Sequence, residues 1–334
     1  MERGKPAPEM IGLRRRPPRP APPPPRAEVH RTEARTKELP AQLLRRLEFK
    51  VVRRLDGFLF GDYRGLFYGP SLDLAEVREY QPGDEVRRID WNVTARSGRL
   101  HVRQYQEERE LTTWLIIDTS PSMDFGTRRA LKSDLARDFA GVAALIVTRH
   151  GDRLGAITFG PAAGMVTPRH GRAQALALMT LLSRPAVSGP PVGTTTLEPA
   201  LTNAGHLMRR RSLVFVVSDF LEGVPPGGGG WAGALGRLAQ RHDVVAVRIS
   251  DPAERILPDV GGLRVRDPES GEELWLDTSD VRVRAAHARL VGERDAALRR
   301  ALHAARVDLL DLGTERDPVP ALLRFVAARR GRRP

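Results

Sequence analysis

A carboxylate and two hydroxyls, spaced two residues apart, stand between an apolar run and a helical pattern. They are Asp118, Ser120 and Ser122, and the apolar run before them covers residues 114–117. Unbroken apolar runs of this kind are typical of strands buried on both faces, so we expect the three side chains where such a strand ends. Ligands bind at this edge of open α/β sheets. Carboxylate and hydroxyl oxygens suit Mg²⁺, so the motif predicts binding of a hard cation.

The motif alone has a simpler explanation, because Asp and Ser are common at helix N-termini. Two further features favour a metal site. Thr194 lies just before a predicted helix, and Asp219 closely follows another apolar run, 213–217. Parallel strands end at one edge of their sheet, so all five side chains are expected to converge from three loops. Thr196 is the alternative ligand if the loop register differs by two residues.

From residue 112 onward, apolar runs alternate with helical patterns. This alternation predicts an α/β domain with a mostly parallel sheet and helices on both faces. The predicted strands are 114–117, 154–159, 165–166, 213–217, 244–249 and 307–312, and the predicted helices are 131–146, 172–182, 197–210, 231–240, 280–305 and 318–330. Residues 263–266 and 272–276 flank a turn and predict a hairpin.

The preceding third of the chain has a different composition. Residues 1–38 are rich in Pro and Arg and are expected to be disordered, because they contain few large apolar residues. Pro40 opens a helical pattern, and short strands are predicted near 77–80 and 100–105. The expected parts are a tail at 1–38, a helix and β-rich extension at 39–110, and an α/β domain at 111–330 with a hairpin and helical insertion near 261–305.

Composition narrows the function classes. The chain has no cysteine, which excludes disulfides, thiolate metal sites and cysteine nucleophiles. The first residues lead into no apolar segment, and the longest uncharged apolar run, 139–148, is too short to cross a bilayer. We therefore expect a cytoplasmic protein with no membrane span.

The net charge of +13 is uneven, since residues 1–54 hold 15 Lys and Arg against 6 Asp and Glu. A basic segment of this kind can bind nucleic acid. Residues 1–38 contain no Phe, Tyr or Trp on which bases could stack, so the sequence disfavours this partner. Nucleic-acid binding through residues 1–54 stays open as an alternative, and it predicts a steep salt dependence.

The motifs resemble two known patterns. Asp118, Ser120 and Ser122, together with Thr194 and Asp219, resemble the metal-ion-dependent adhesion site (MIDAS) of von Willebrand factor A domains. The charged block 78–91, residues 249–260 and residues 277–280 look like the bacterial family named "domain of unknown function 58". The resemblance covers about residues 58–330 and implies a von Willebrand A-like, Rossmann-like fold.

The resemblance also implies how the site acts. Asp118, Ser120, Ser122 and Thr194 would face a divalent cation, Mg²⁺ or Mn²⁺, directly or through water, and Asp219 would act mainly through water. Such an ion stays electrophilic and can take a carboxylate from a partner protein. Family members are often encoded beside MoxR-type AAA+ ATPases. The implied function is a non-enzymatic adaptor that works with such an ATPase in protein maturation or remodelling.

An enzymatic alternative is a metal-dependent phosphatase with Asp118 as nucleophile. Haloacid-dehalogenase-type enzymes place a second carboxylate two residues later as the acid/base, and this chain has Ser120 there. No phosphate-binding loop or dinucleotide fingerprint is present, so we expect no nucleotide cofactor.

Overall fold

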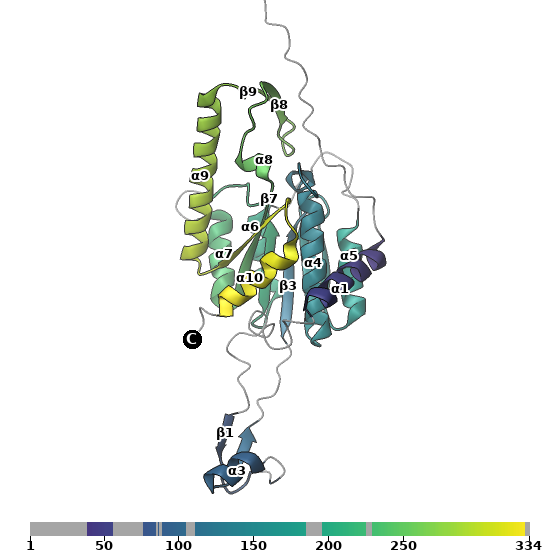
Figure 1. The fold of residues 1–334 in the computed structure, drawn as a ribbon, viewed down its shortest axis with the longest axis vertical. Coiled ribbons are helices and arrows are strands. Elements are labelled where there is room, and N and C mark those ends of the chain that lie inside the picture. The colour runs from purple at the N-terminus through teal and green to yellow at the C-terminus, as the bar shows by residue number, and fades with distance from the viewer. Residues whose placement is uncertain are drawn as a thin grey trace, which may run out of the picture.

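The chain forms an α/β body around a six-stranded sheet (Figure 1). The structure is a computed structural model that describes residues 39–55, 76–84, 86, 89–104, 111–184, 196–224 and 229–330. The strands are β3 (Thr112–Asp118), β4 (Arg153–Phe159), β5 (Gly164–Arg169), β6 (Leu213–Ser218), β7 (Asp243–Ser250) and β10 (Asp308–Gly313). Only β5, at one edge of this sheet, pairs antiparallel, so the predicted mostly parallel sheet is confirmed.

The strand order across the sheet is β10-β7-β6-β3-β4-β5. The chain therefore builds outward from β3 through β4 to β5, then returns to the other side of β3 and continues outward from β6. β3 and β6 are parallel neighbours, with Ile117 paired to Val217. Their carboxyl ends meet where the strand order reverses, and this switch point is where open α/β sheets form their binding crevice.

Helices cover both faces of the sheet (Figure 1). One face carries α4 (Lys132–Arg149), α5 (Arg172–Leu182) and α10 (Pro318–Arg330), and the other carries α6 (Leu197–Leu207), α7 (Gly230–Arg241) and α9 (Val281–Ala304). Successive residues of β3 point to opposite faces. Leu115 and Ile117 enter the first core, whereas Trp114 and Ile116 enter the second. Burial on both faces explains why this strand is a continuous apolar run.

The N-terminal helix α1 (Pro40–Leu55) packs on the α/β body. Its residues Leu43, Leu44 and Leu47 are buried in the core that α4 and α5 also line. Gly141 of α4 makes this approach close, because an added Cβ would lie 2.4 Å from Leu47 Cδ1. The expected grouping of α1 with the β-rich extension at 39–110 therefore differs from the structure. The three leucines of α1 pack against apolar residues of α4 and α5.

The extension itself is a small unit of two antiparallel strands and a helix. These are β1 (Glu76–Glu79), α3 (Trp91–Ser97) and β2 (His101–Gln104). α3 was not predicted, because none of its residues is buried and it carries no apolar periodicity. Capping interactions nevertheless define both ends of α3. Asp90 accepts hydrogen bonds from the amides of Asn92 and Val93, and Gly98, with φ 69°, ends the helix.

Two short helices and a hairpin complete the described fold. They are η2 (Pro121–Asp124), α8 (Pro252–Arg255) and the antiparallel pair β8 (Gly262–Arg266) and β9 (Glu273–Asp277), which confirms the predicted hairpin. The expected tail at 1–38 and residue Thr194 lie outside the described residues. Within the described residues, none of the helices combines the length and apolar character needed to cross a membrane.

The packing of α1 gives a stability prediction. Leu44 is 1% exposed, so Leu44→Ala should lower the free energy of unfolding by about 2–4 kcal/mol through lost burial and the cavity left behind. Leu39, next to the start of the same helix, is 62% exposed, and Leu39→Ala should change it by less than about 0.5 kcal/mol. Urea denaturation followed by tryptophan fluorescence measures both. Equal effects would contradict the docking of α1 on the body.

Candidate metal centre

Asp118 is the last residue of β3, and its carboxylate joins β3 to its neighbour β6. Its Oδ1 accepts a hydrogen bond from the Ser120 amide at 2.8 Å, and its Oδ2 accepts one from Ser218 Oγ at 2.6 Å. The residue is 7% exposed. Burial, followed by the negative charge of Asp219, raises the pKa of Asp118 to about 6, although the hydrogen bonds from Ser120 and Ser218 oppose this rise.

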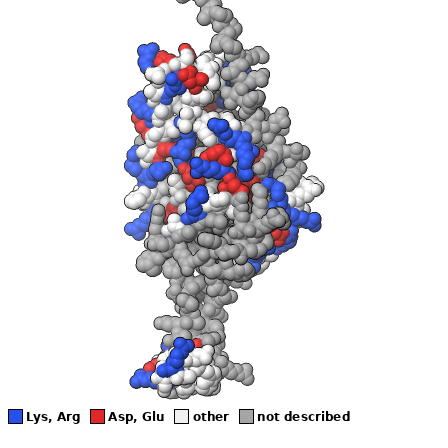
Figure 2. Space-filling model, in the orientation of Figure 1, with Lys and Arg blue, Asp and Glu red and all other residues white. Residues whose placement is uncertain are grey.

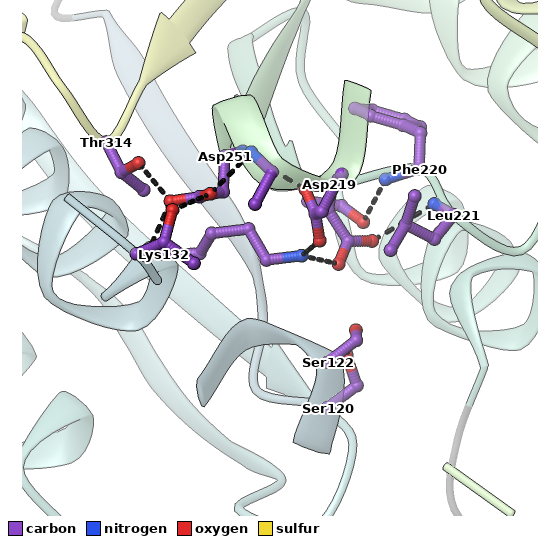
Figure 3. A network of polar contacts seen from close by, with 12 residues as sticks. Ser120, Ser122, Lys132, Asp219, Phe220, Leu221, Asp251 and Thr314 are labelled. Carbon is purple, nitrogen blue, oxygen red and sulfur yellow. Dashed lines mark hydrogen bonds and ion pairs between the residues drawn. The ribbon is translucent and has the colours of Figure 1, made fainter. Parts of the chain in front are cut away.

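Ser120 and Ser122 lie at the start of η2, directly after Asp118. Their hydroxyl oxygens are 3.0 Å apart, and the two side chains lie side by side in Figure 3. Ser120 has an extended backbone and caps η2, and Pro121 at the first helical position favours the turn. The tight turn therefore places two hydroxyls from alternate positions together beside a buried carboxylate.

Asp219 follows β6 and is held by a buried lysine. Lys132 Nζ, from the first turn of α4, donates to Asp219 Oδ2 at 2.7 Å and to Glu254 Oε1 of α8 at 2.5 Å. Lys132 is fully buried. Burial works to lower the pKa of Lys132, but the charges and hydrogen bonds of Asp219 and Glu254 outweigh it, so the pKa is raised. The other oxygen of Asp219 accepts from the Leu221 amide at 3.0 Å.

A third buried carboxylate, Asp251, extends this network between strand ends (Figure 3). Asp251 is fully buried. Its oxygens accept hydrogen bonds from the Thr127 amide at 2.9 Å, from Thr127 Oγ1 at 2.6 Å and from Thr314 Oγ1 at 2.5 Å. It also forms a capping box with Glu254 at the start of α8. Asp251 thus fixes the loop before α4 against the ends of β7 and β10, and it orients Glu254 toward Lys132.

One further carboxylate reaches the serines from the β8–β9 hairpin. Glu269 lies at the tip of that hairpin, and its Oε1 accepts a hydrogen bond from the Ser122 amide at 3.0 Å. The two residues are 147 positions apart in the sequence. The hairpin tip therefore contacts the turn that carries the hydroxyl pair.

The structure brings together four of the five predicted ligands. Asp118, Ser120 and Ser122 form one cluster, and the charge of Asp219 acts on Asp118 from the adjacent strand end. Thr194 lies outside the described residues. Thr196, the alternative, is an exposed cap at the start of α6. The Leu197 amide donates to Glu222 Oε2 at 3.4 Å, so α6 begins beside the loop that follows β6.

The donor chemistry fits a hard divalent cation. Two neutral hydroxyls and the buried carboxylate of Asp118 offer oxygen ligands. Burial and the negative charge of Asp219 raise the pKa of Asp118, so a nearby cation would stabilise its ionised form. Asp219 already has a positive partner in Lys132, which favours a role through water. A cavity of about 90 Å³ borders Asp118 and Ser120, and Arg137 and Arg184 also line it.

The sequence analysis missed the residues that form hydrogen bonds between different helices, strands and loops. Ser218 had a sequence signal, because it is a polar residue at the end of an apolar strand. Lys132 and Glu254 had none, since their pairing depends on how α4 and α8 meet. Glu269 lies in a stretch, Asp-Pro-Glu-Ser-Gly, that indicates only a turn.

The raised pKa of Asp118 gives a pH-dependent stability prediction for the metal-free protein. The pKa is about 6 in the folded state against 3.8 ordinarily, so between these values the folded state holds a proton that the unfolded chain has lost. Wild-type stability should therefore fall as pH rises through about 4 to 6. Asp118→Asn removes this fall, and at pH 7.5 in EDTA it should raise the free energy of unfolding by up to about 3 kcal/mol.

Urea denaturation across this pH range, in EDTA, measures the effect. Asp124→Asn, a nearby exposed carboxylate on η2, is the control and should follow the wild-type curve. If Asp118→Asn is less stable than wild type at pH 7.5 in EDTA, Asp118 is a structural residue and its carboxylate is not under strain.

The buried lysine gives a second prediction. Lys132→Met should lower the free energy of unfolding by about 3–5 kcal/mol, because Asp219 and Glu254 would lose their positive partner. Adding Asp219→Asn to this variant removes one of the unpaired charges and should recover part of the loss. Denaturation of both single variants and the double variant measures the coupling. Additive effects would show that the pair contributes nothing specific.

Solved structures similar to this chain have low scores. A conserved hypothetical protein BatB from Bacteroides thetaiotaomicron is 14% identical, with a TM-score of 0.41, and the match covers 66% of this chain and 98% of that one. A von Willebrand factor type A protein from Catenulispora acidiphila is 17% identical, with a TM-score of 0.36, covering 66% and 42%. At such scores these likenesses carry no weight for the fold, which rests on the strand order itself.

Sequence relatives are much nearer. An uncharacterized protein of Mycobacterium tuberculosis is 40% identical over 295 residues, which is 87% of this chain and 90% of the relative. The model of the family described as "Protein of unknown function DUF58" matches residues 76–297, from β1 into α9. This match covers the extension, every strand of the sheet except β10, the serine turn at residues 120–122 and the hairpin, and the chain therefore belongs to the DUF58 family.

Proposed function

We propose that the chain is a non-enzymatic protein-interaction module that binds Mg²⁺ or Mn²⁺ at a MIDAS-like site and recognises a carboxylate of a partner protein. The observation that carries this proposal is the pair of hydroxyls, Ser120 and Ser122, 3.0 Å apart beside the buried carboxylate of Asp118. An ion held by hydroxyls keeps most of its positive charge, and it can bind a further oxygen ligand. Thr194 is proposed as an additional ligand.

The surroundings of the site favour an anionic partner. Arg137 and Arg184 line the cavity beside Asp118 and Ser120. On the face shown in Figure 2, Lys and Arg are intermixed with Asp and Glu over the described surface. Charge there is not arranged in one field of a single sign, so recognition would depend on local contacts at the site. The partner class comes from the family resemblance, and we propose a MoxR-type AAA+ ATPase.

The proposal assigns no catalytic residue. A phosphatase that used Asp118 as nucleophile would need an acid/base group two residues later. Ser120 stands there, and its hydroxyl shares a hydrogen bond with the Ser122 hydroxyl. We therefore expect no release of phosphate from a generic aryl phosphate in Mg²⁺.

Metal binding is tested first. Isothermal titration of the full chain with Mn²⁺ should show one site, and Ser122→Ala should weaken binding by about ten-fold or more because one oxygen ligand is lost. The control is Ser212→Ala, a buried serine just before β6 at the opposite edge of the sheet. Equal affinities for wild type and Ser122→Ala would overturn the site, whereas a weaker Ser212→Ala would indicate a general folding effect.

Partner binding is tested next, with tagged protein in a lysate of the source organism. Wild type in Mg²⁺ should capture a AAA+ ATPase that is absent with wild type in EDTA and with Asp118→Ala in Mg²⁺. Identical proteins in all three samples would show that the ion does not govern binding. If the captured proteins depend on Mg²⁺ but include no AAA+ ATPase, the result would support a metal-dependent interaction module and contradict the proposed partner class.

A further inference from the structure

The tip of the β8–β9 hairpin contacts the candidate site through one acidic side chain. Glu269 Oε1 accepts a hydrogen bond from the Ser122 amide at 3.0 Å, although Glu269 is itself exposed. Within the described part of the chain, this is the hydrogen bond that joins hairpin residues 262–277 to the α/β body. Figure 1 shows the hairpin beyond the carboxyl edge of the sheet, above the start of α4. The hairpin thus carries a carboxylate to the residue whose hydroxyl belongs to the proposed site.

The hairpin tip is ordered by its own hydrogen bonds before it reaches Ser122. The Asp267 carboxylate accepts from the Glu269 amide at 3.0 Å and from Ser270 Oγ at 2.6 Å. The Ser270 hydroxyl lowers the pKa of Asp267, which keeps this carboxylate ionised. Gly271, with φ 76°, provides the left-handed residue that closes the turn. The turn therefore has a defined backbone conformation at Glu269.

The base of the hairpin is closed by several contacts between its flanking residues, in contrast to its lightly held tip. Thr278 is fully buried, and its Oγ1 donates to the Gly261 carbonyl at 2.7 Å and accepts from the Val260 amide at 3.0 Å. Arg284 of α9 pairs with Asp259 at 3.0 Å beside it. A hairpin anchored at its base and joined to the site by a single bond at its tip can leave the site without disturbing the sheet.

We propose that Glu269 is an internal carboxylate ligand of the cation site, which a partner's carboxylate replaces when the hairpin moves away. This inference rests on the proposed function of the same site. Glu269 contacts the amide of Ser122, the residue that carries one of the two hydroxyls. A carboxylate added to the two hydroxyls and Asp118 would extend the set of oxygen ligands that a hard cation takes. In this role Glu269 would take the position that an incoming carboxylate uses. The specificity of the module is then for acidic groups that compete successfully with Glu269.

The test is Mn²⁺ binding to the full chain, with acetate as the probe carboxylate. Glu269→Ala should weaken Mn²⁺ binding by about five-fold or more, because one anionic ligand is lost. Replacing chloride with acetate at equal ionic strength should restore part of the affinity of this variant and leave wild type unchanged. Glu272→Ala removes another exposed glutamate of the same hairpin and should bind Mn²⁺ like wild type.

Hydrogen exchange of the Ser122 amide gives a readout that needs no metal. In EDTA, exchange at Ser122 should be faster in Glu269→Ala than in wild type or Glu272→Ala, because the acceptor for this amide is lost. Unchanged exchange would overturn the contact.

The outcomes separate this inference from the function on which it rests. If wild type binds Mn²⁺, Ser122→Ala does not, and Glu269→Ala binds as wild type does, only the internal ligand is overturned. If wild type fails to bind Mn²⁺, both are overturned. Loss of affinity in Glu269→Ala without rescue by acetate would show that Glu269 supports the turn and is not replaceable by a free carboxylate.

Discussion

The carboxyl edge of this sheet depends on one buried ammonium group. Lys132 is fully buried and neutralises Asp219 from β6 and Glu254 from α8 at the same time. It begins α4, so it ties the helix that follows the serine turn to the end of β6 and to α8. A buried charge without a partner costs several kcal/mol, and the three groups are therefore compatible only when α4, β6 and α8 take these positions. Asp251 and its two threonine partners extend the same constraint to β10.

This arrangement leaves the two carboxylates nearest the switch point in different states. Asp219 has its counter-charge in Lys132, whereas Asp118 is buried and makes no ion pair among the described residues, and its pKa is raised to about 6. The local deficit of positive charge is therefore at Asp118, beside the two hydroxyls of Ser120 and Ser122. A divalent cation would remove this deficit, and this is the physical reason for placing the ion there. The lysine contact supports the proposal that Asp219 acts through water.

Much of the fold follows from patterns that a single sequence carries. The continuous apolar runs of β3 and β6 predict buried parallel strands, and their burial on both faces confirms the reading. Topology then brings Asp118 and Asp219 to neighbouring strand ends. The short helix α3 was missed because it buries no residue, although Asp90 and Gly98 mark its ends. The leucines of α1 show that it packs on an apolar surface, but not on which one. The structure shows that this surface belongs to α4 and α5.

The site was predictable where its residues are local or directly follow neighbouring strands. Asp118, Ser120 and Ser122 share one turn, so their spacing alone places them together. The pairings of Lys132 with Glu254, and of Glu269 with Ser122, join segments 122 and 147 positions apart and have no local pattern. Single charged residues in turns and helix starts are common on protein surfaces, and only the packed structure distinguishes these from their neighbours.

The most direct test of a cation at this edge is crystallographic. Crystals of the full chain grown with MnCl₂, measured near the manganese absorption edge, would locate the ion by its anomalous scattering. The account predicts one strong peak about 2.1 Å from the hydroxyl oxygens of Ser120 and Ser122, on the side that faces Asp118. A fully bound ion at another position, or no peak at this edge in crystals whose serine turn is accessible, would contradict it.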